Sequence, residues 1–165
     1  MRKLAALVRH IMEQTGLPPE QIRAYADQGD LYPIGRDRGP LRDGDVLRRQ
    51  VELGLLKYDG VIQIERYPGP GADFCALITA WVTDNDPRRD GLEDPVIDVD
   101  LNIRGGDSDV QIAIEFEERL EAVEAPDGNI PFGGVRWTLA PAMVTPVEQL
   151  ARLDAVNQGA GKGPR

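Results

Sequence analysis

Two aspartates have the type and spacing that could support chemistry. Asp98 and Asp100 are separated by one residue, Val99, in an apolar segment. In an extended strand such residues share a face, where two carboxylates could hold a divalent cation. The same alternation is also what a strand with one solvated face shows. Because this simpler interpretation explains the pattern, we predict no metal site, and a metal-dependent hydrolase using Asp98 and Asp100 remains an alternative.

The other reactive residue types offer even less. His10 and Cys75 are the single histidine and the single cysteine, so neither has a partner at metal-ligand spacing. A thiol nucleophile needs a nearby base, and Cys75 beside Phe74 is interpreted as a small hydrophobic residue. The glycine-containing segments do not match a phosphate-binding loop. We therefore expect no catalytic residue, no cofactor and no enzyme.

Charge and cysteine content narrow the class of protein further. The 165 residues include 19 Lys and Arg against 28 Asp and Glu, a formal net charge of −9. This balance argues against gripping nucleic acid through phosphate contacts, though not against surrounding DNA without holding it. A lone cysteine favours a reducing compartment. With no stretch of roughly 18 apolar residues, we expect a soluble protein made in a cytoplasm, without membrane contact.

The elements that must position these residues begin with a helix. Apolar residues at helical spacing predict it over residues 2–14. A second, short helix is predicted over 19–26, with Tyr25 facing inward. The stretch 35–44 carries charges and turn residues, and it is interpreted as an exposed loop.

The pattern then changes to alternation. It predicts strands over 56–67, 95–103 and 109–120, with an amphipathic helix over 72–83 after the first strand. Turn residues at 105–108 would make the last two strands antiparallel neighbours. Packing the apolar face of the helix on the sheet would form the core, and each buried large apolar side chain contributes roughly 1.5–3 kcal/mol.

The last third of the chain predicts an edge strand over 133–139, carrying Trp137, and a helix that begins at Thr145. The fold class is predicted as α+β, with helices packed on a mainly antiparallel sheet. One domain would cover residues 1–157, and residues 158–165 would be a flexible C-terminal tail.

A series of short patterns follows in order between residues 56 and 123. They are Glu65-Arg66-Tyr67 at a strand end, Ala80-Trp81 at a helix end, Asn85-Asp86-Pro87, Asp100-Leu101-Asn102, Asp109-Val110-Gln111-Ile112 and Glu118-Arg119-Leu120. In this order the segment resembles the tail completion protein R family of P2-like contractile-tailed bacteriophages (tail terminators). Residues 1–30 fit that family more loosely, while 35–49 and the chain after about Asp127 look like extensions.

The resemblance implies a tail-terminator-like fold and a structural role in the virion, with assembly in the host bacterial cytoplasm. The protein would form a hexameric ring at the head-proximal end of the contractile tail, stop polymerisation of the tube and sheath, and help join the tail to the head. Its partners would be further copies of itself, tail tube and sheath proteins, and neck or connector proteins. Genomic DNA would pass through the ring without specific binding.

Six residues are candidates for lining the channel or an interface: Asp98, Asp100, Asp107, Asp109, Glu118 and Arg119. Acidic side chains in the channel would repel phosphates and let DNA slide, although the aspartates could equally solvate the outside of the ring. Glu118 and Arg119 could pair across neighbouring subunits, or form an ordinary surface ion pair.

Two alternatives to the terminator and the hydrolase stay open. Another neck or head-to-tail joining protein of similar size would bind filled heads and would not cap tubes. An acidic mimic of DNA would bind a basic host protein, which is possible from charge alone.

Overall fold

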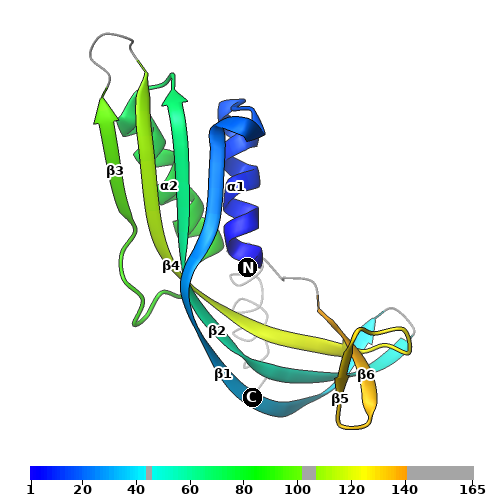
Figure 1. The fold of residues 1–165 in the computed structure, drawn as a ribbon. Coiled ribbons are helices and arrows are strands. Elements are labelled where there is room, and N and C mark those ends of the chain that lie inside the picture. Colours follow the sequence, from blue (N-terminus) through cyan, green and yellow to red (C-terminus); the bar gives the residue numbers. More distant parts are fainter. Residues whose placement is uncertain (44–45, 102–106, 141–165) are drawn as a thin grey trace, which may run out of the picture.

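Long strands dominate the architecture. In a computed structural model, which describes residues 1–43, 46–101 and 107–140, the chain forms a six-stranded antiparallel sheet (Figure 1). The strands are β1 (Ile22–Asp43), β2 (Val46–Tyr67), β3 (Val96–Leu101), β4 (Ser108–Glu124), β5 (Ile130–Phe132) and β6 (Val135–Leu139). Their order is β1-β2-β4-β6-β5, and β3 pairs with the first part of β4.

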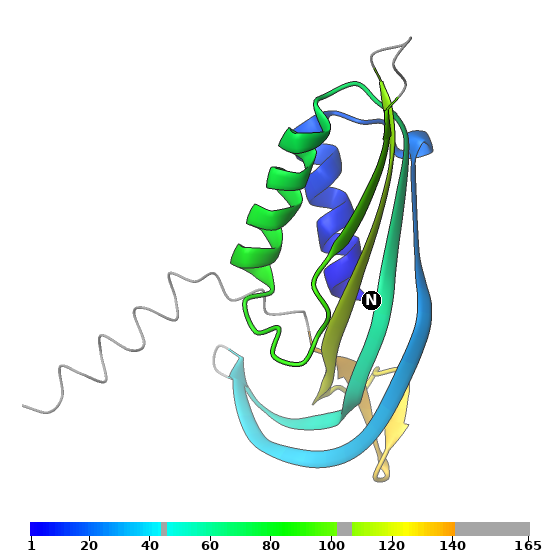
Figure 2. The same ribbon diagram turned by 90° about the vertical axis from the view of Figure 1, so that its left-hand side faces the viewer.

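Two helices cover one face of one half of this sheet. Helix α1 (Arg2–Thr15) and helix α2 (Gly71–Asn85) lie over β3 and the adjoining parts of β1, β2 and β4 (Figures 1 and 2). Helix α1 ends at Gly16, whose φ of 68° lies in the left-handed region that glycine tolerates best. We call these two helices and the strands beneath them the helix-covered half.

The main core lies between the helices and this half of the sheet. Alternate residues of β2 and β4, such as Ile62 and Ile112, point toward the helices and are fully buried. Phe74 and Ile78 of α2 and Leu7 of α1 meet them from the other side. The alternation of apolar residues, together with an apolar stripe on each helix, is therefore what fixes this layer.

Beyond the helices the three long strands continue and curve away as an arm (Figures 1 and 2). The arm comprises residues 32–43 of β1, 46–55 of β2 and 119–124 of β4, together with β5 and β6. Its own buried cluster is small, with Val51, Ala122 and Trp137 at its centre. No helix of the described residues covers the arm.

The predicted fold class is wrong. The described chain is mostly antiparallel sheet, with two α-helices over one half of it, and is not the predicted helix-packed α+β fold. The helix predicted over 19–26 is a 3₁₀ turn at Pro19–Gln21 followed by strand, and the loop predicted over 35–44 is the far part of β1 through Asp43. Both errors come from one cause: the register of β1 against β2 overrides weak local signals.

Other predicted elements are confirmed. The helices over 2–14 and 72–83 exist. The strands predicted over 95–103 and 109–120 correspond to β3 and β4, which are antiparallel neighbours, although residues 102 and 103 lie outside the described residues. The strand predicted over 133–139 exists as β6, but it lies between β4 and β5 and is not an edge. The predicted helix from Thr145 and the tail over 158–165 lie outside the described residues.

Candidate assembly interface

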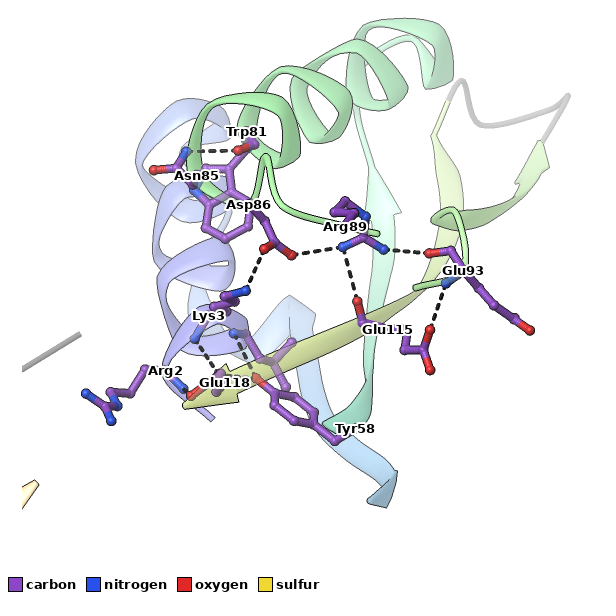
Figure 3. Close-up of polar contacts among 11 residues, drawn as sticks. Arg2, Lys3, Tyr58, Trp81, Asn85, Asp86, Arg89, Glu93, Glu115 and Glu118 are labelled. Atoms are coloured by element: carbon purple, nitrogen blue, oxygen red, sulfur yellow. Dashed lines mark hydrogen bonds and ion pairs between the residues drawn. The ribbon is translucent and has the colours of Figure 1, made fainter. Parts of the chain in front are cut away.

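A buried carboxylate ties helix α1 to the sheet. Glu118 on β4 accepts hydrogen bonds from the backbone N–H groups of Arg2 and Lys3, at 2.9 and 2.8 Å, and from the Tyr58 hydroxyl (Figure 3). These N–H groups are unpaired within the helix, and the helix dipole favours a negative charge there. Burial disfavours the charged form, yet these hydrogen bonds outweigh it and hold the pKa of Glu118 below its ordinary value.

A second polar group links both helices to the sheet through Asp86, which follows α2. Its carboxylate lies 2.5 Å from Lys3 Nζ and 2.9 Å from Arg89 Nη1 (Figure 3). Arg89 Nη1 also donates to the backbone carbonyl of Glu115 on β4, at 3.1 Å. Asp86 is 2% exposed, so these contacts hold the fold together and are not available to a partner.

The opposite face of the helix-covered half carries the acidic residues singled out in the sequence. Asp98 and Asp100 of β3 are exposed and share this uncovered face, as the alternation predicts. Asp100 stands directly opposite Asp109 of β4, whose side chain accepts a hydrogen bond from the Arg66 N–H at 2.9 Å. Like charges in opposite positions destabilise a sheet, so the fold itself gains nothing from this pair. Asp107 is half-buried just before β4.

Glu118 and Arg119 do not lie with these aspartates. Glu118 points toward the helices, and Arg119, its neighbour on the strand, points to the other face. Arg119 Nη1 instead lies 3.2 Å from a carboxylate oxygen of Glu52 in the arm. A surface ion pair between Glu118 and Arg119 is therefore not formed within the chain.

The burial of Glu118 could be predicted from the sequence. The apolar alternation from Val110 to Phe116, continued by one step, puts residue 118 on the buried face. The contacts of Asp86 with Lys3 and Arg89 could not be predicted in this way, because they join α1 to the segment after α2.

In the part of the chain that the structure describes, no three His, Cys, Asp or Glu residues gather closely enough to hold an ion. Among the same residues, no helix has the length and apolarity to cross a membrane.

The arm exposes apolar side chains. Leu47, Phe132 and Leu139 are exposed on the face that carries Trp137, Tyr32 is exposed on the opposite face, and Ile34 is exposed as well. Trp137 is buried beside Phe132, with ring centres 6.5 Å apart, and donates its indole N–H to the backbone carbonyl of Phe132 at 2.8 Å. Exposed apolar side chains gathered on one projecting element mark an interaction surface. Sequence reasoning missed this surface, since part of it was interpreted as a loop.

The helix-covered half also ends in two open edges. Among the described residues, the first part of β1 and the whole of β3 each pair with one strand only. Val96 on β3 is 63% exposed and Tyr25 on β1 is 39% exposed. An edge strand presents unpaired N–H and C=O groups to any further strand.

Comparison with known proteins agrees with a role in assembly. The family described as P2 phage tail completion protein R (GpR) matches residues 1–141. A protein of Haemophilus phage HP1 (strain HP1c1), described as an uncharacterized 19.2 kDa protein in the rep-hol intergenic region, is 33% identical over 128 residues, which cover 74% of this chain and 76% of the phage protein. No solved structure matches the chain.

Proposed function

Since the chain belongs to the P2 phage tail completion protein R family, we propose that it acts as a ring that terminates the contractile tail. The family gives the coarser role, a structural component that completes phage tails. In our proposal the ring sits at the head-proximal end, halts growth of tube and sheath, and offers the surface to which neck or connector proteins join. A hexamer matches the symmetry of a tail.

The observation that carries this proposal is the division of the subunit into two parts. The helix-covered half has a complete core, whereas the arm leaves apolar residues such as Leu47 and Phe132 exposed. A subunit that is stable alone but exposes one projecting apolar surface suits a protein whose work is done by contacts. We assign the arm to the contact with the end of the tube and sheath.

The acidic face supports a further part of the proposal, namely that DNA passes through the ring without binding to it. Asp98, Asp100 and Asp109 share the uncovered face, and Asp107 lies beside it. If this face lines the channel, its negative charge repels the phosphates of DNA, so DNA passes without binding. The cost of placing Asp100 opposite Asp109 then serves transport and not stability.

The experiment is electron microscopy of negatively stained tails from phage that lack this gene, with purified protein added or withheld. We expect over-long or sheath-unstable headless tails without the protein, and tails of normal length with it. The variant Asp100→Asn should correct tail length as well as the wild-type protein does.

Three results would contradict the proposal. Tails of normal length that fail only to join filled heads would indicate a neck protein. Tails of normal length that join heads without the protein would remove both roles. Loss of tail-length correction in the Asp100→Asn variant would favour a hydrolase that uses Asp98 and Asp100.

A further inference from the structure

The two open edges of the helix-covered half have opposite directions. In the order β1-β2-β4-β3 every neighbouring pair is antiparallel. With four strands, the first and the last therefore run in opposite directions. A copy of the subunit placed beside another would bring its β1 against the neighbour's β3 in antiparallel orientation. The sheet could then continue from one subunit to the next.

The rows of paired residues inside the sheet supply one register for such a junction. Tyr25 lies opposite Val61, Val61 opposite Ala113, and Ala113 opposite Val96. These four residues form one row across the uncovered face. Continuing the row across the junction places Tyr25 of one copy opposite Val96 of the next.

Backbone hydrogen bonding stays in phase across that junction. In an antiparallel sheet each residue directs its N–H and C=O to one side, so pairs along a row alternate between hydrogen-bonded and non-hydrogen-bonded. Three pairs lie within the row of one subunit, so its first and last pairs are of the same type. Tyr25 and Val96 therefore direct their backbone N–H and C=O groups in the same sense, either both toward the junction or both away from it, and can form one regular pair. A subunit with an odd number of strands would not have this property.

Side chains match in the same register. Antiparallel pairing puts Arg23 opposite Asp98 on the uncovered face, next to Tyr25 and Val96. Arg23 is exposed, with its guanidinium carbon 5.5 Å from the centre of the Tyr25 ring. On the helix side, Ile22 would face Val99, and both already pack against the main core. The junction thus joins opposite charges on one face and apolar residues on the other.

The two edges also offer matching lengths. β3 spans six residues, Val96–Leu101. The regular part of β1 begins after the 3₁₀ turn and ends at the irregularity between Asp27 and Gly29. With Tyr25 opposite Val96, the two segments overlap over residues 22–25 of one copy and 96–99 of the next. The irregularity after Asp27 would prevent the pairing from extending along β1 into the arm.

We propose that subunits of the ring join edge to edge, with β1 of one copy pairing antiparallel with β3 of the next and Tyr25 opposite Val96. The contact is heterologous, using two different surfaces of the chain, and such contacts generate a ring when the rotation closes. This inference rests on the proposed ring but names the surfaces that would build it. It places Asp98 at each subunit junction.

Disulfide trapping tests the register. Directly opposite residues in an antiparallel pair have Cα atoms about 4.5 or 5.5 Å apart, and both separations suit a disulfide. We would place Tyr25→Cys and Val96→Cys in a Cys75→Ser background, in phage, and oxidise the purified tails. Non-reducing gels should show a ladder of covalent oligomers that collapses on reduction. The control pairs Tyr25→Cys with Asp100→Cys, about 13 Å out of register, and should show no ladder.

The outcomes separate this inference from the proposed function. Tails that contain the protein and are capped, yet yield no ladder or a cross-link to a different protein, would overturn the edge pairing and leave the terminator role standing. If tails lack the protein altogether, the terminator role is refuted. The edge pairing is then tested by oxidising the purified double-cysteine protein. A ladder then supports the inference, and its absence refutes it.

Charge reversal provides an independent readout. Arg23→Asp and Asp98→Arg should each lower the yield of capped tails by about tenfold or more, because each puts like charges together at every junction. The double variant, which restores an opposite-charge pair, should recover most of that yield. Equal loss in the double variant would contradict the register.

Discussion

The helix-covered half and the arm share the same three strands but differ in how they are stabilised. Among the described residues, the first surrounds 16 buried core residues with two helices and a sheet, whereas the buried cluster of the arm contains three. In the arm, backbone pairing and ion pairs replace packing: Glu52 is 2% exposed, with Arg38 Nε at 3.1 Å and Arg119 Nη1 at 3.2 Å. One continuous sheet can therefore serve as a stable body at one end and as a contact surface at the other.

The strongest way to break this comparison is to remove packing from each region in turn. Phe116→Ala deletes a fully buried ring that lies 5.6 Å from the Tyr58 ring, and it should cost about 3–5 kcal/mol of unfolding free energy. Leu47→Ala, in the exposed arm, should change it by no more than about 0.5 kcal/mol. Chemical denaturation of both variants measures the difference. Equal losses would mean that the arm is part of the core.

A smaller effect is expected from the carboxylate that anchors α1. Glu118→Gln keeps the shape but removes the charge that three donors share, and it should cost about 1–3 kcal/mol. The matched control is Glu117→Gln, one residue along β4 and exposed. Thermal unfolding followed by circular dichroism compares the two. A loss as large in the control would show that charge alone, and not the anchor, matters.

The same anchor predicts a dependence on pH. The pKa of Glu118 is lowered in the folded protein from an ordinary value of 4.5, because hydrogen bonds from Tyr58 and the α1 backbone favour the charged form despite burial. A lowered folded pKa contributes stability that is fully present above the unfolded pKa and is lost as pH falls through the folded pKa. Unfolding free energy should therefore decline below about pH 4.5. Denaturation across pH 2–7 should show a shallower decline in Glu118→Gln.

The smallest effect on stability should accompany a large effect on assembly. Replacing Leu47 and Phe132 together by Ser removes exposed apolar area and should change unfolding free energy by less than about 1 kcal/mol. The same variant should fail to correct over-long tails in the electron microscopy assay. Full correction would separate the arm from tail binding and sharpen the search toward the uncovered face of the other half.

Sequence patterns predicted the helix-covered half well because its signals are local. The stripe from Phe74 to Val82 and the alternation from Val110 to Phe116 each bury one face of one element. β1 could not be predicted in this way. It is an edge strand with Pro33, and its glycines Gly35 and Gly39 take φ values of 65° and 80° at irregularities of the register. Its conformation is set by pairing with β2, which no window of its own sequence records.

In the candidate site, too, only the features that depend on a single strand could be predicted. Alternation was enough to place Asp98 and Asp100 on one face, because that depends only on their spacing in a strand. Their nearness to Asp109 depends on the register between two strands. The exposed apolar surface of the arm depends on three strands and a hairpin coming together, so single-segment patterns carried no information about it.

The unbroken course of β2 has a mechanical meaning. Its 22 residues run from the arm into the core, a length along the strand of about 70 Å at roughly 3.3 Å per residue. A load applied at the arm and directed along the strands would act on the hydrogen bonds to both neighbours in shear, so many bonds would resist it together. A load across the sheet would peel them one after another. The arm should thus be stiff against axial tension from the tail and yielding to sideways displacement.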